Sequence, residues 1–519
     1  MREQSGREQS GSRERSKSGA SRCGCRINRV VVGSVMGIGL CPDTLGAPGD
    51  ELWRALPEVG YDALQFGSAV DLNGPLALVI GEGIFTTPTP GGAFIVYAET
   101  GDQLALLPQP VRPEGGAPID AWFYGGAISG PMDLSAVKPG AGAARVAVVG
   151  TAEIAPCACY RPLVRGFELS DPASPTLLWS VRPDGFEFDD AFGDAIAIDG
   201  GLMLVGASGD DDNGPLSGAA YLFDVATGTQ LGKLLADDGE GLDQFGYSVD
   251  LDGSLAIVGA RWESEVANRA GAAYVFDITD PANPVQVAKL VAPDGGELDY
   301  MGWDVAILDA EGLSPALAVV GSIFDDDLGL DSGAAYVFGL ADPASPVLHG
   351  KMLAPDGGAT DDFGWGVALE RTGDGVVGVI TARTDDEGGP GVGSAYIYDF
   401  ADPASPSLVE KVLPSVVTSN DVFGWSVALD GGRAIVGAPG ADDQGNSSGA
   451  AYLIDATFGP SACNPADLSE PFGTLDLADI SVFVGAFTTQ QPPADLNNDG
   501  VFDLADISGF VGSFSDGCP

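Results

Sequence analysis

The chain of 519 residues has a single histidine, His349, and only 24 lysine and arginine residues against 74 aspartate and glutamate residues. Because there is only this one histidine, and it falls at an ordinary position of a predicted strand, a Ser-His-Asp triad or a multi-histidine metal site is excluded. The sparse basic residues provide no electrostatic footprint for nucleic acid. With a formal charge of -50, the surface repels nucleic acid and anionic membranes and attracts cations. Most of these carboxylates are predicted to serve solubility in saline or calcium-rich water.

Long apolar runs are also missing. The run at Val30–Leu40 has eleven residues, which suits the core of a signal peptide and is too short to span a bilayer. A polar stretch with eight arginine or lysine residues precedes it. Residues 1–41 are therefore predicted to be a leader or signal region, and the protein is predicted to be secreted or on the cell surface. Cys41 offers lipidation as an alternative, but the bulky Leu40 stands where such sites favour a small residue.

The seven cysteines are few for the length of the chain. Cys463 and Cys518 bracket the C-terminal segment, as a disulfide between its two ends would require. Cys157 and Cys159 are too close together for a comfortable disulfide, and the region offers too few further ligands for a metal site. Sparse, partly paired cysteines fit an extracytoplasmic protein.

What the chain does have is a repeated phrase headed by a phenylalanine-glycine pair. In the clearest copy, which begins at Phe245, it reads FGYSVDLDG, then SLAIVGA, then GAAYVFD. Seven copies, two of them degenerate, lie about 53 to 68 residues apart and begin at Phe66, Tyr124, Phe192, Phe245, Met301, Phe363 and Phe423. A fixed period of this length indicates a propeller, a solenoid or an array.

Each copy contains four short apolar runs separated by turn residues, which predicts four strands. Asp252-Gly253 marks a tight hairpin between the first two runs, and a DPASP or DPANP turn separates the third from the fourth in several copies. Four antiparallel strands per unit predict an all-β fold, a seven-bladed β-propeller over residues 42–458. Glycines that recur after Val and before Ala-Ala are predicted to allow close backbone approach where the blades meet.

The last copy ends at Asp455 without a fourth strand, whereas the segment ELWRALPEVGYDALQFG precedes the first copy and matches a later one. The strand near Leu52–Leu56 is therefore predicted to complete the last blade by pairing with Ala450–Ile454. Such closure leaves no unpaired sheet edge. The alternative is an open array of separate hairpin units.

These phrases resemble the FG-GAP repeats of integrin alpha-subunit propellers and their bacterial relatives, over roughly Asp43–Asp455. The resemblance implies a propeller with a role in binding or adhesion. Calcium-binding integrin blades carry an Asp-rich loop between their first two strands. Here that link is only LDG or IDG, as at Leu251-Asp252-Gly253, so calcium binding is not predicted at that place.

The C-terminal segment, residues 459–519, contains a duplicated unit. Its second copy matches a calcium-binding loop, with Gly500 at the sharp turn and predicted oxygen ligands from Asp495, Asn497, Asp499, the Val501 carbonyl, Asp503 and Asp506. The first copy has Leu468 and Phe472 at two ligand positions and is predicted to bind calcium weakly or not at all.

The two loop-helix units resemble dockerin type I modules. The resemblance implies a small α-helical calcium-loop domain that uses Ca²⁺ as its cofactor and attaches to a cohesin-like or cell-envelope protein. The partner-selecting positions of such modules hold Leu504-Ala505 and Leu477-Ala478 here, which departs from the hydroxyl-rich pairs often found there. A calcium-stapled cap that binds nothing is the alternative.

Acidic residues recur in the links that a propeller places on one face. They lie between second and third strands or between blades, at Asp210–Asp212, Asp325–Asp327, Asp385-Asp386, Asp442-Asp443, Asp189, Asp243, Asp361 and Asp362. Like charges crowded on one face cost stability unless cations or a basic partner compensate them. This face is predicted either to bind an unknown protein, glycan or cation, or to be a solvated rim.

Together these features predict a secreted, non-catalytic binding or adhesion protein, recognising a partner through the propeller face and anchored through calcium by the C-terminal module. The acids recur blade by blade, whereas an active site needs a unique constellation, so no enzyme is predicted. The rival interpretation is an accessory or catalytic component of extracellular polysaccharide degradation, which a unique pair of channel carboxylates would favour. Neither a nucleic-acid partner nor a transmembrane segment is predicted.

Overall fold

The structure is a computed structural model. It describes residues 49, 51–56, 64–81, 92–98, 101, 103–107, 122–128, 132–133, 143–154, 160–185, 190–312, 314–372, 375–442 and 444–457, and in the C-terminal segment only Ile480, Phe483, Val484, Phe487 and Ile507. The predicted signal region, the cysteines, the six predicted calcium ligands and, apart from those five residues, the predicted helical calcium-loop domain lie outside the described residues. Within those ranges, no helix is long and apolar enough to cross a membrane.

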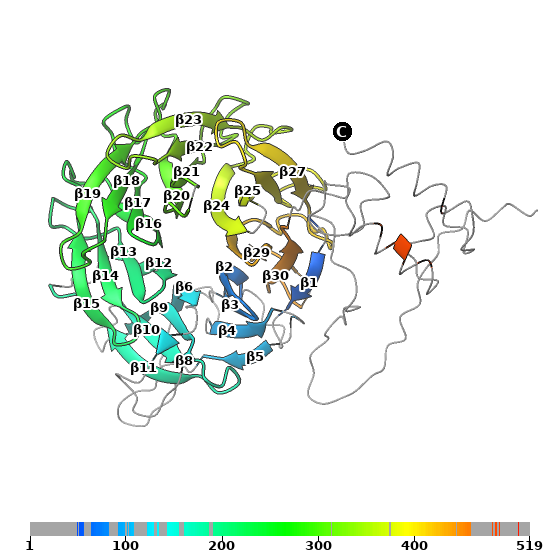
Figure 1. The fold of residues 1–519 in the computed structure, drawn as a ribbon, viewed down its shortest axis with the longest axis horizontal. Coiled ribbons are helices and arrows are strands. Elements are labelled where there is room, and N and C mark those ends of the chain that lie inside the picture. The colour runs from blue at the N-terminus through cyan, green and yellow to red at the C-terminus, as the bar shows by residue number, and fades with distance from the viewer. Residues whose placement is uncertain are drawn as a thin grey trace, which may run out of the picture. The chain divides into compact units, whose positions relative to one another are not determined.

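Seven sheets of four antiparallel strands surround a central opening like the blades of a propeller (Figure 1). This confirms the predicted all-β, seven-bladed fold. From the innermost strand outward, blade 1 consists of β2 (Phe66–Asn73), β3 (Leu76–Gly81), β4 (Gly92–Tyr97) and β5 (Gln103–Leu106). Blade 2 consists of β6 (Trp122–Ile128), β9 (Val146–Ile154), β10 (Tyr160–Glu168) and β11 (Thr176–Val181). Blade 3 consists of β12 (Phe192–Asp199), β13 (Leu202–Ala207), β14 (Ala219–Asp224) and β15 (Thr229–Leu234).

Blades 4 to 7 follow the same plan. They are β16 (Phe245–Asp252), β17 (Leu255–Ala260), β18 (Ala272–Asp277) and β19 (Val285–Leu290); β20 (Met301–Leu308), β21 (Leu317–Ser322), β22 (Ala334–Gly339) and β23 (Val347–Met352); β24 (Phe363–Thr372), β25 (Gly375–Ala382), β26 (Ser394–Asp399) and β27 (Ser407–Val412); and β28 (Ser426–Asp430), β29 (Arg433–Ala438), β30 (Ala450–Asp455) and β1 (Glu51–Ala55). A short extra pair, β7 (Met132–Asp133) and β8 (Ala143–Ala144), lies between the first two strands of blade 2.

The second and third strands of each blade form the core, because neighbouring blades cover both of their faces. In β17, LAIVGA, every residue is buried, whereas the outer strand β19 is partly exposed. Leu255 and Val275 of blade 4 pack in one cluster with Ile307 and Tyr336 of blade 5. These continuous apolar runs are therefore strands buried on both faces, not amphipathic ones.

The backbones of adjacent blades meet at glycines, as the sequence predicts. Gly246 has a φ of +88°, and a Cβ added there would lie 2.1 Å from the carbonyl oxygen of Ala219 in blade 3. Gly218 forms a parallel bridge with Phe245 in the next blade, and the same bridge joins Gly271 to Met301 in the degenerate fifth copy. Side chains larger than glycine would push the blades apart.

The ring closes through its N-terminal strand. β1 pairs antiparallel with β30, with Arg54 opposite Tyr452 and Ala55 opposite Ala451. Figure 1 shows this blue strand beside the last strands of the chain. The predicted pairing is confirmed, and it ties the two ends of the propeller sequence together without leaving the edge of β30 open.

The hairpin aspartates between the first and second strands join neighbouring blades. Asp199 Oδ2 of blade 3 accepts a hydrogen bond of 2.9 Å from the Gly253 amide of blade 4. Asp430 Oδ2 of blade 7 accepts one of 2.6 Å from the Gly74 amide of blade 1. Because these carboxylates satisfy backbone amides of the next hairpin, their recurrence has a structural cause.

Candidate functional site

The loops between second and third strands and the links between blades lie on one side of the ring, here called the loop face. Backbone hydrogen bonds join the two kinds of segment, from the Leu242 amide to the Pro215 carbonyl at 2.8 Å and from the Thr360 amide to the Leu330 carbonyl at 2.7 Å. The predicted gathering of acidic links on one face is therefore correct for the acids that the structure describes; Asp189 and Asp443 lie outside them.

In blade 6 a lysine lies at the centre of these acids. Lys411 Nζ on β27 lies 2.5 Å from Asp356, 2.8 Å from Asp385 and 2.7 Å from Glu387. The Tyr396 hydroxyl, on the neighbouring strand, lies 2.9 Å from both Asp356 and Asp385. The Lys411 side chain is only 15% exposed and that of Asp385 only 6%. The ammonium therefore acts as an internal counter-ion for the loop carboxylates.

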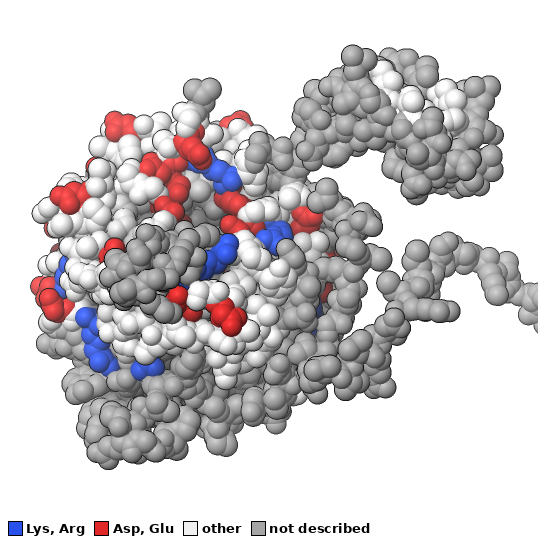
Figure 2. Space-filling model, turned by 60° about the horizontal axis from the view of Figure 1, so that its bottom comes forward, with Lys and Arg blue, Asp and Glu red and all other residues white. Residues whose placement is uncertain are grey.

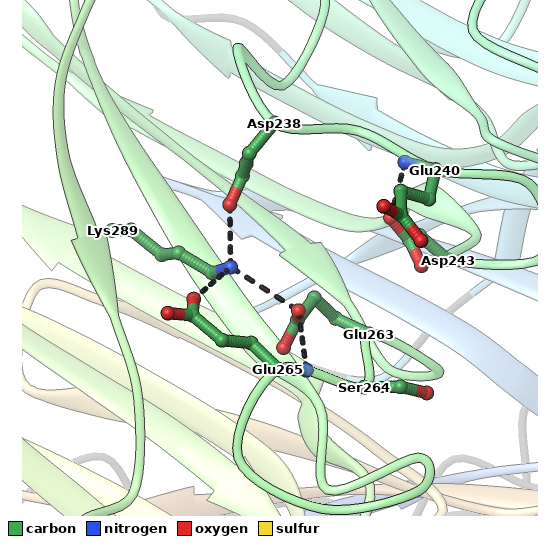
Figure 3. A pocket seen from close by; sticks show the side chains of 7 residues that line it. All are labelled: Asp238, Glu240, Asp243, Glu263, Ser264, Glu265 and Lys289. Carbon is green, nitrogen blue, oxygen red and sulfur yellow. Dashed lines mark hydrogen bonds and ion pairs between the residues drawn. The ribbon is translucent and has the colours of Figure 1, made fainter.

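The same arrangement repeats in blades 3, 4 and 5. In each, a fourth-strand lysine stands opposite a third-strand tyrosine, and the pairs are Lys233 with Tyr221, Lys289 with Tyr274 and Lys351 with Tyr336. Figure 3 shows the blade 4 version, with the Lys289 ammonium between Asp238, Glu263 and Glu265 at 2.6, 3.2 and 2.7 Å. We call these groups the lysine clusters.

The pKa values follow from this pairing. Burial alone would raise the pKa of Asp385, but hydrogen bonds from Lys411, the Glu387 amide and Ser394 outweigh burial and bring that pKa below its ordinary value. Burial alone would lower the pKa of Lys411, but its three carboxylate partners raise it. Both partners are therefore charged at neutral pH, and each lysine cluster is held by its own ion pairs.

The remaining recurring acids cap turns of the loop face. The middle acid of each acidic loop accepts a hydrogen bond from a backbone amide five residues further on, as for Asp211 with Leu216 and Asp386 with Gly391. Link acids do the same within their own link, where Asp361 Oδ2 accepts from Gly358 at 2.6 Å. In Figure 2, acidic side chains form separate groups, some beside basic ones, and no continuous patch. Among the described residues, no group of three or more His, Cys, Asp or Glu could hold a metal ion.

Blade 7 departs from the pattern. Ala441 stands at the place of the first loop acid, and Arg54 of β1 stands at the place of the lysine. The Arg54 guanidinium lies 4.8 Å from the centre of the Tyr452 ring. The closing blade thus keeps the cation and the tyrosine but lacks the buried acid.

A second group of side chains lines the mouth of the central channel on the loop face. It comes from the third residue of the repeat, directly after Phe-Gly or Met-Gly, in four consecutive blades, and its members are Tyr247, Trp303, Trp365 and Trp425. Ring centres of successive members lie 5.1, 4.6 and 5.0 Å apart. We call this group the aromatic arc.

Two arginines stack on the aromatic arc. The Arg261 guanidinium lies 3.6 Å from the centre of the Tyr247 ring, and that of Arg383 lies 3.3 Å from the Trp365 ring. Arg383 also pairs with Asp362 at 2.8 Å. Such stacking fixes the rings and places positive charge beside them.

The channel mouth is a cavity of about 420 Å³ with two unlike walls. The aromatic arc forms one wall, and Ser68 and Asp194 of blades 1 and 3 contribute to the rest, with Asp304 beside Trp303. Asp194 makes no hydrogen bond or ion pair with the described part of the chain. Asp304 Oδ2 accepts a hydrogen bond of 2.9 Å from the Val367 amide. Neither carboxylate recurs at the same place in another copy.

The surrounding channel walls desolvate these carboxyls. They raise the pKa of Asp194 to about 6, although its side chain is exposed to channel water, and that of the half-buried Asp304 to about 7. Deeper in the channel, burial raises the pKa of Asp250 to about 8, and the charges of Asp252 and Asp304 add to this effect. These carboxyls change charge near neutral pH, which fits hydrogen bonding to a ligand or proton transfer.

Sequence reasoning identified the acidic loops and missed the aromatic arc. The signal was present, since the residue after Phe-Gly or Met-Gly is Tyr, Trp, Trp and Trp in four successive copies. The aromatic arc is not part of the pattern shared by all copies, because it occupies only blades 4 to 7. The predicted calcium ligands Asp495, Asn497, Asp499, Val501, Asp503 and Asp506 lie outside the described residues, so their prediction stands untested.

Comparison with known proteins agrees with the repeat. Five segments match the family model described as FG-GAP repeat, at residues 182–223, 229–276, 284–338, 347–398 and 406–454. No curated protein matches the chain. Most of the matched segments begin near the outer strand of one blade and continue through the first three strands of the next. The sequence repeat is therefore offset by one strand from the structural blade. The position of β1, an outer strand at the start of the propeller sequence, agrees with this offset.

Proposed function

Since the chain is a seven-bladed propeller that carries FG-GAP repeats, we propose that it is a non-catalytic binding or adhesion protein whose loop face recognises a partner. Loops on a rigid ring suit such a role, because the sheet holds them in place while their sequences vary. The observation that supports the proposal best is a set of large aliphatic side chains exposed on this face.

These side chains come from loops and links of successive blades. They are Leu242, Val266, Leu298, Leu328, Leu330, Val416 and Val417, with exposed fractions from 39% to 64%. Exposed apolar side chains beside satisfied polar groups are the composition of a protein-binding surface. Each lysine of the lysine clusters neutralises only one of the two or three carboxylates around it, so the loop face keeps negative charge beside these apolar side chains.

The proposal also covers where the protein acts and how it is attached to the cell. We propose that the protein acts outside the cytoplasm and that the dockerin-like segment, with Ca²⁺ at Asp495, Asp499, Asp503 and Asp506, anchors it to a cohesin-like or cell-envelope protein. The sequence of the C-terminal loop and the apolar run Val30–Leu40 support these points.

Binding to envelope material of the source organism tests the loop face. We expect the full-length protein to sediment with the envelope in the presence of calcium, and the double variant Leu242→Ser/Leu330→Ser to bind at least about tenfold more weakly, because two buried aliphatic contacts are lost. Leu177→Ser/Val347→Ser is the matched control.

The control residues are as exposed, at 52% and 57% against 50% and 64%, but they lie on the outer strands β11 and β23. Equal binding by the two double variants would refute recognition through the loop face.

Calorimetric titration of the full chain with calcium tests the anchor. Asp506→Ala should abolish the heat of binding at the second loop, and Asp479→Ala in the first loop should change it little. Equal losses from the two substitutions would overturn the assignment.

Polysaccharide degradation is the second candidate, and one observation favours it. The channel mouth holds two carboxyls that no other copy repeats, Asp194 and Asp304, as a pair of glycosidase acids requires. Release of reducing ends from polysaccharides, lost in Asp304→Asn, would establish this candidate. Under the binding proposal no reducing ends are released.

A further inference from the structure

We propose that the channel mouth is a saccharide-binding site, in which the aromatic arc receives a sugar ring and Asp194 and Asp304 receive its hydroxyl groups. The inference deepens the proposed function, on which it rests, by naming the chemistry of a ligand at the centre of the loop face.

The aromatic arc gives the site a rigid, apolar wall. Trp303 and Trp425 are half-buried and line the cavity, so their apolar surface faces channel water. Trp365 between them is buried, and its indole nitrogen donates a hydrogen bond of 2.9 Å to the Trp425 carbonyl, which fixes the wall. A rigid aromatic wall suits the flat, partly apolar face of a pyranose ring.

The carboxyl groups give the site hydrogen-bond acceptors. Asp194 lies across the mouth without a hydrogen bond or ion pair to the described residues, and the second wall is otherwise built from small residues such as Ser68 and Ala69. A carboxyl group in a confined site is stabilised most by hydrogen-bond donors that contact it directly, and sugar hydroxyl groups are such donors. Ligand hydroxyls therefore satisfy an acceptor that the fold leaves open.

Charge decides against other ligands. Arg261 and Arg383 already stack on the arc and place two positive charges beside it, which disfavours an ammonium or guanidinium ligand on the same rings. The chain carries a formal charge of -50, which disfavours nucleotides and other polyanions. A neutral saccharide can stack on the aromatic rings and donate hydrogen bonds to the carboxyl groups. The cavity of about 420 Å³ is large enough for one or two sugar rings.

Titration calorimetry of the full-length protein with neutral hexasaccharides tests the site. The probes are cellohexaose, laminarihexaose, mannohexaose, xylohexaose and chitohexaose, with hexagalacturonate, tetramethylammonium and oligolysine as charged comparisons. We expect at least one neutral probe to bind with quenching of tryptophan fluorescence and with little dependence on salt, because no net charge is neutralised.

Substitutions then place the ligand. Trp303→Ala and Trp425→Ala should each weaken binding about tenfold or more, and Trp303→Phe, which keeps an aromatic face, should weaken it less. Trp179→Ala is the control, because Trp179 is also half-buried but lies on the outer strand β11. Asp194→Asn should weaken binding modestly, since the amide keeps one acceptor oxygen.

Three outcomes would overturn the inference. They are no binding by any neutral probe, equal loss in Trp179→Ala and Trp303→Ala, and salt-sensitive binding of tetramethylammonium or oligolysine that Trp303→Ala abolishes. If the envelope still binds the protein through Leu242 and Leu330 while saccharides do not bind, the saccharide inference fails and the proposed function stands.

Discussion

Two groups of carboxylates in this protein have opposite surroundings. In the lysine clusters of the loop face, acids such as Asp385 contact an ammonium group, a tyrosine and a backbone amide, and their pKa values are lowered. In the channel, Asp194, Asp250 and Asp304 have no cation partner among the described residues, and desolvation by the channel walls raises their pKa values.

The difference shows that acidity alone does not identify a binding site in this protein. The recurring acids, which dominate the sequence, already have partners within their own blade. Asp194 and Asp304, which do not recur in another copy, line the same cavity as the aromatic arc. We therefore propose that ligands bind where the repeat is broken.

Removing a cluster lysine should have the largest effect. In Lys411→Met the buried carboxylate of Asp385 loses its counter-ion, so we expect the free energy of unfolding at pH 7 to fall by about 3 to 5 kcal/mol. Denaturant unfolding followed by circular dichroism measures the change. The double variant Lys411→Met/Asp385→Asn should recover much of the loss, because both charges are then absent. A single variant as stable as the wild type would show that the clusters are solvated and not internally paired.

Removing a channel carboxyl should change the pH dependence of stability. Asp250 has a pKa raised from 3.8 to about 8, so between these values the folded protein holds a proton that the unfolded chain releases. The stability from this group is fully present below about pH 4 and is lost as the pH rises through 8. Asp250→Asn should therefore reduce the decline between pH 5 and 9 by on the order of 2 kcal/mol.

The control for this prediction is an exposed acid. A hydrogen bond from Thr279 lowers the pKa of Asp277, so Asp277→Asn should leave the profile between pH 5 and 9 unchanged. Parallel profiles for Asp250→Asn and the wild type would mean that the channel carboxyls are as well solvated as ordinary surface acids.

A hairpin aspartate should show the smallest effect. Asp430→Ala removes the hydrogen bond to the Gly74 amide between the last and first blades, and we expect a loss of about 1 to 2 kcal/mol. Thermal unfolding measures it, with Glu311→Ala as the control, because the exposed side chain of Glu311 makes no such hydrogen bond. Equal melting temperatures for the two variants would show that these carboxylates do not join the blades.

Most of the fold could be predicted from the sequence repeat. Phe-Gly, Val-Gly-Ala and Gly-Ala-Ala-Tyr phrases in register predicted four strands per blade, and the glycines predicted the contacts between blades, since only glycine admits the approach seen at Gly218 and Gly246. The closing strand was predictable because Glu51–Ala55 resembles the fourth strand that the last copy lacks.

The candidate site was less predictable. The sequence places acids on one face, but it does not reveal that Lys411, far along the chain from Asp356, reaches three of them. Such partners depend on strand register and on contacts between blades. Nor does the sequence reveal that the third residues of four separate repeat copies converge at one mouth, because convergence around an axis is a property of the closed ring.

The central claim is that ligands enter the channel mouth and not the lysine clusters. A crystal structure of the full-length protein, grown with the hexasaccharide that binds most tightly, tests it most directly. The account predicts a sugar ring against Trp303 and Trp425 with a hydroxyl group on Asp194, and Lys233, Lys289, Lys351 and Lys411 still paired with their carboxylates. A saccharide bound among these lysines, with the channel mouth empty, would contradict it.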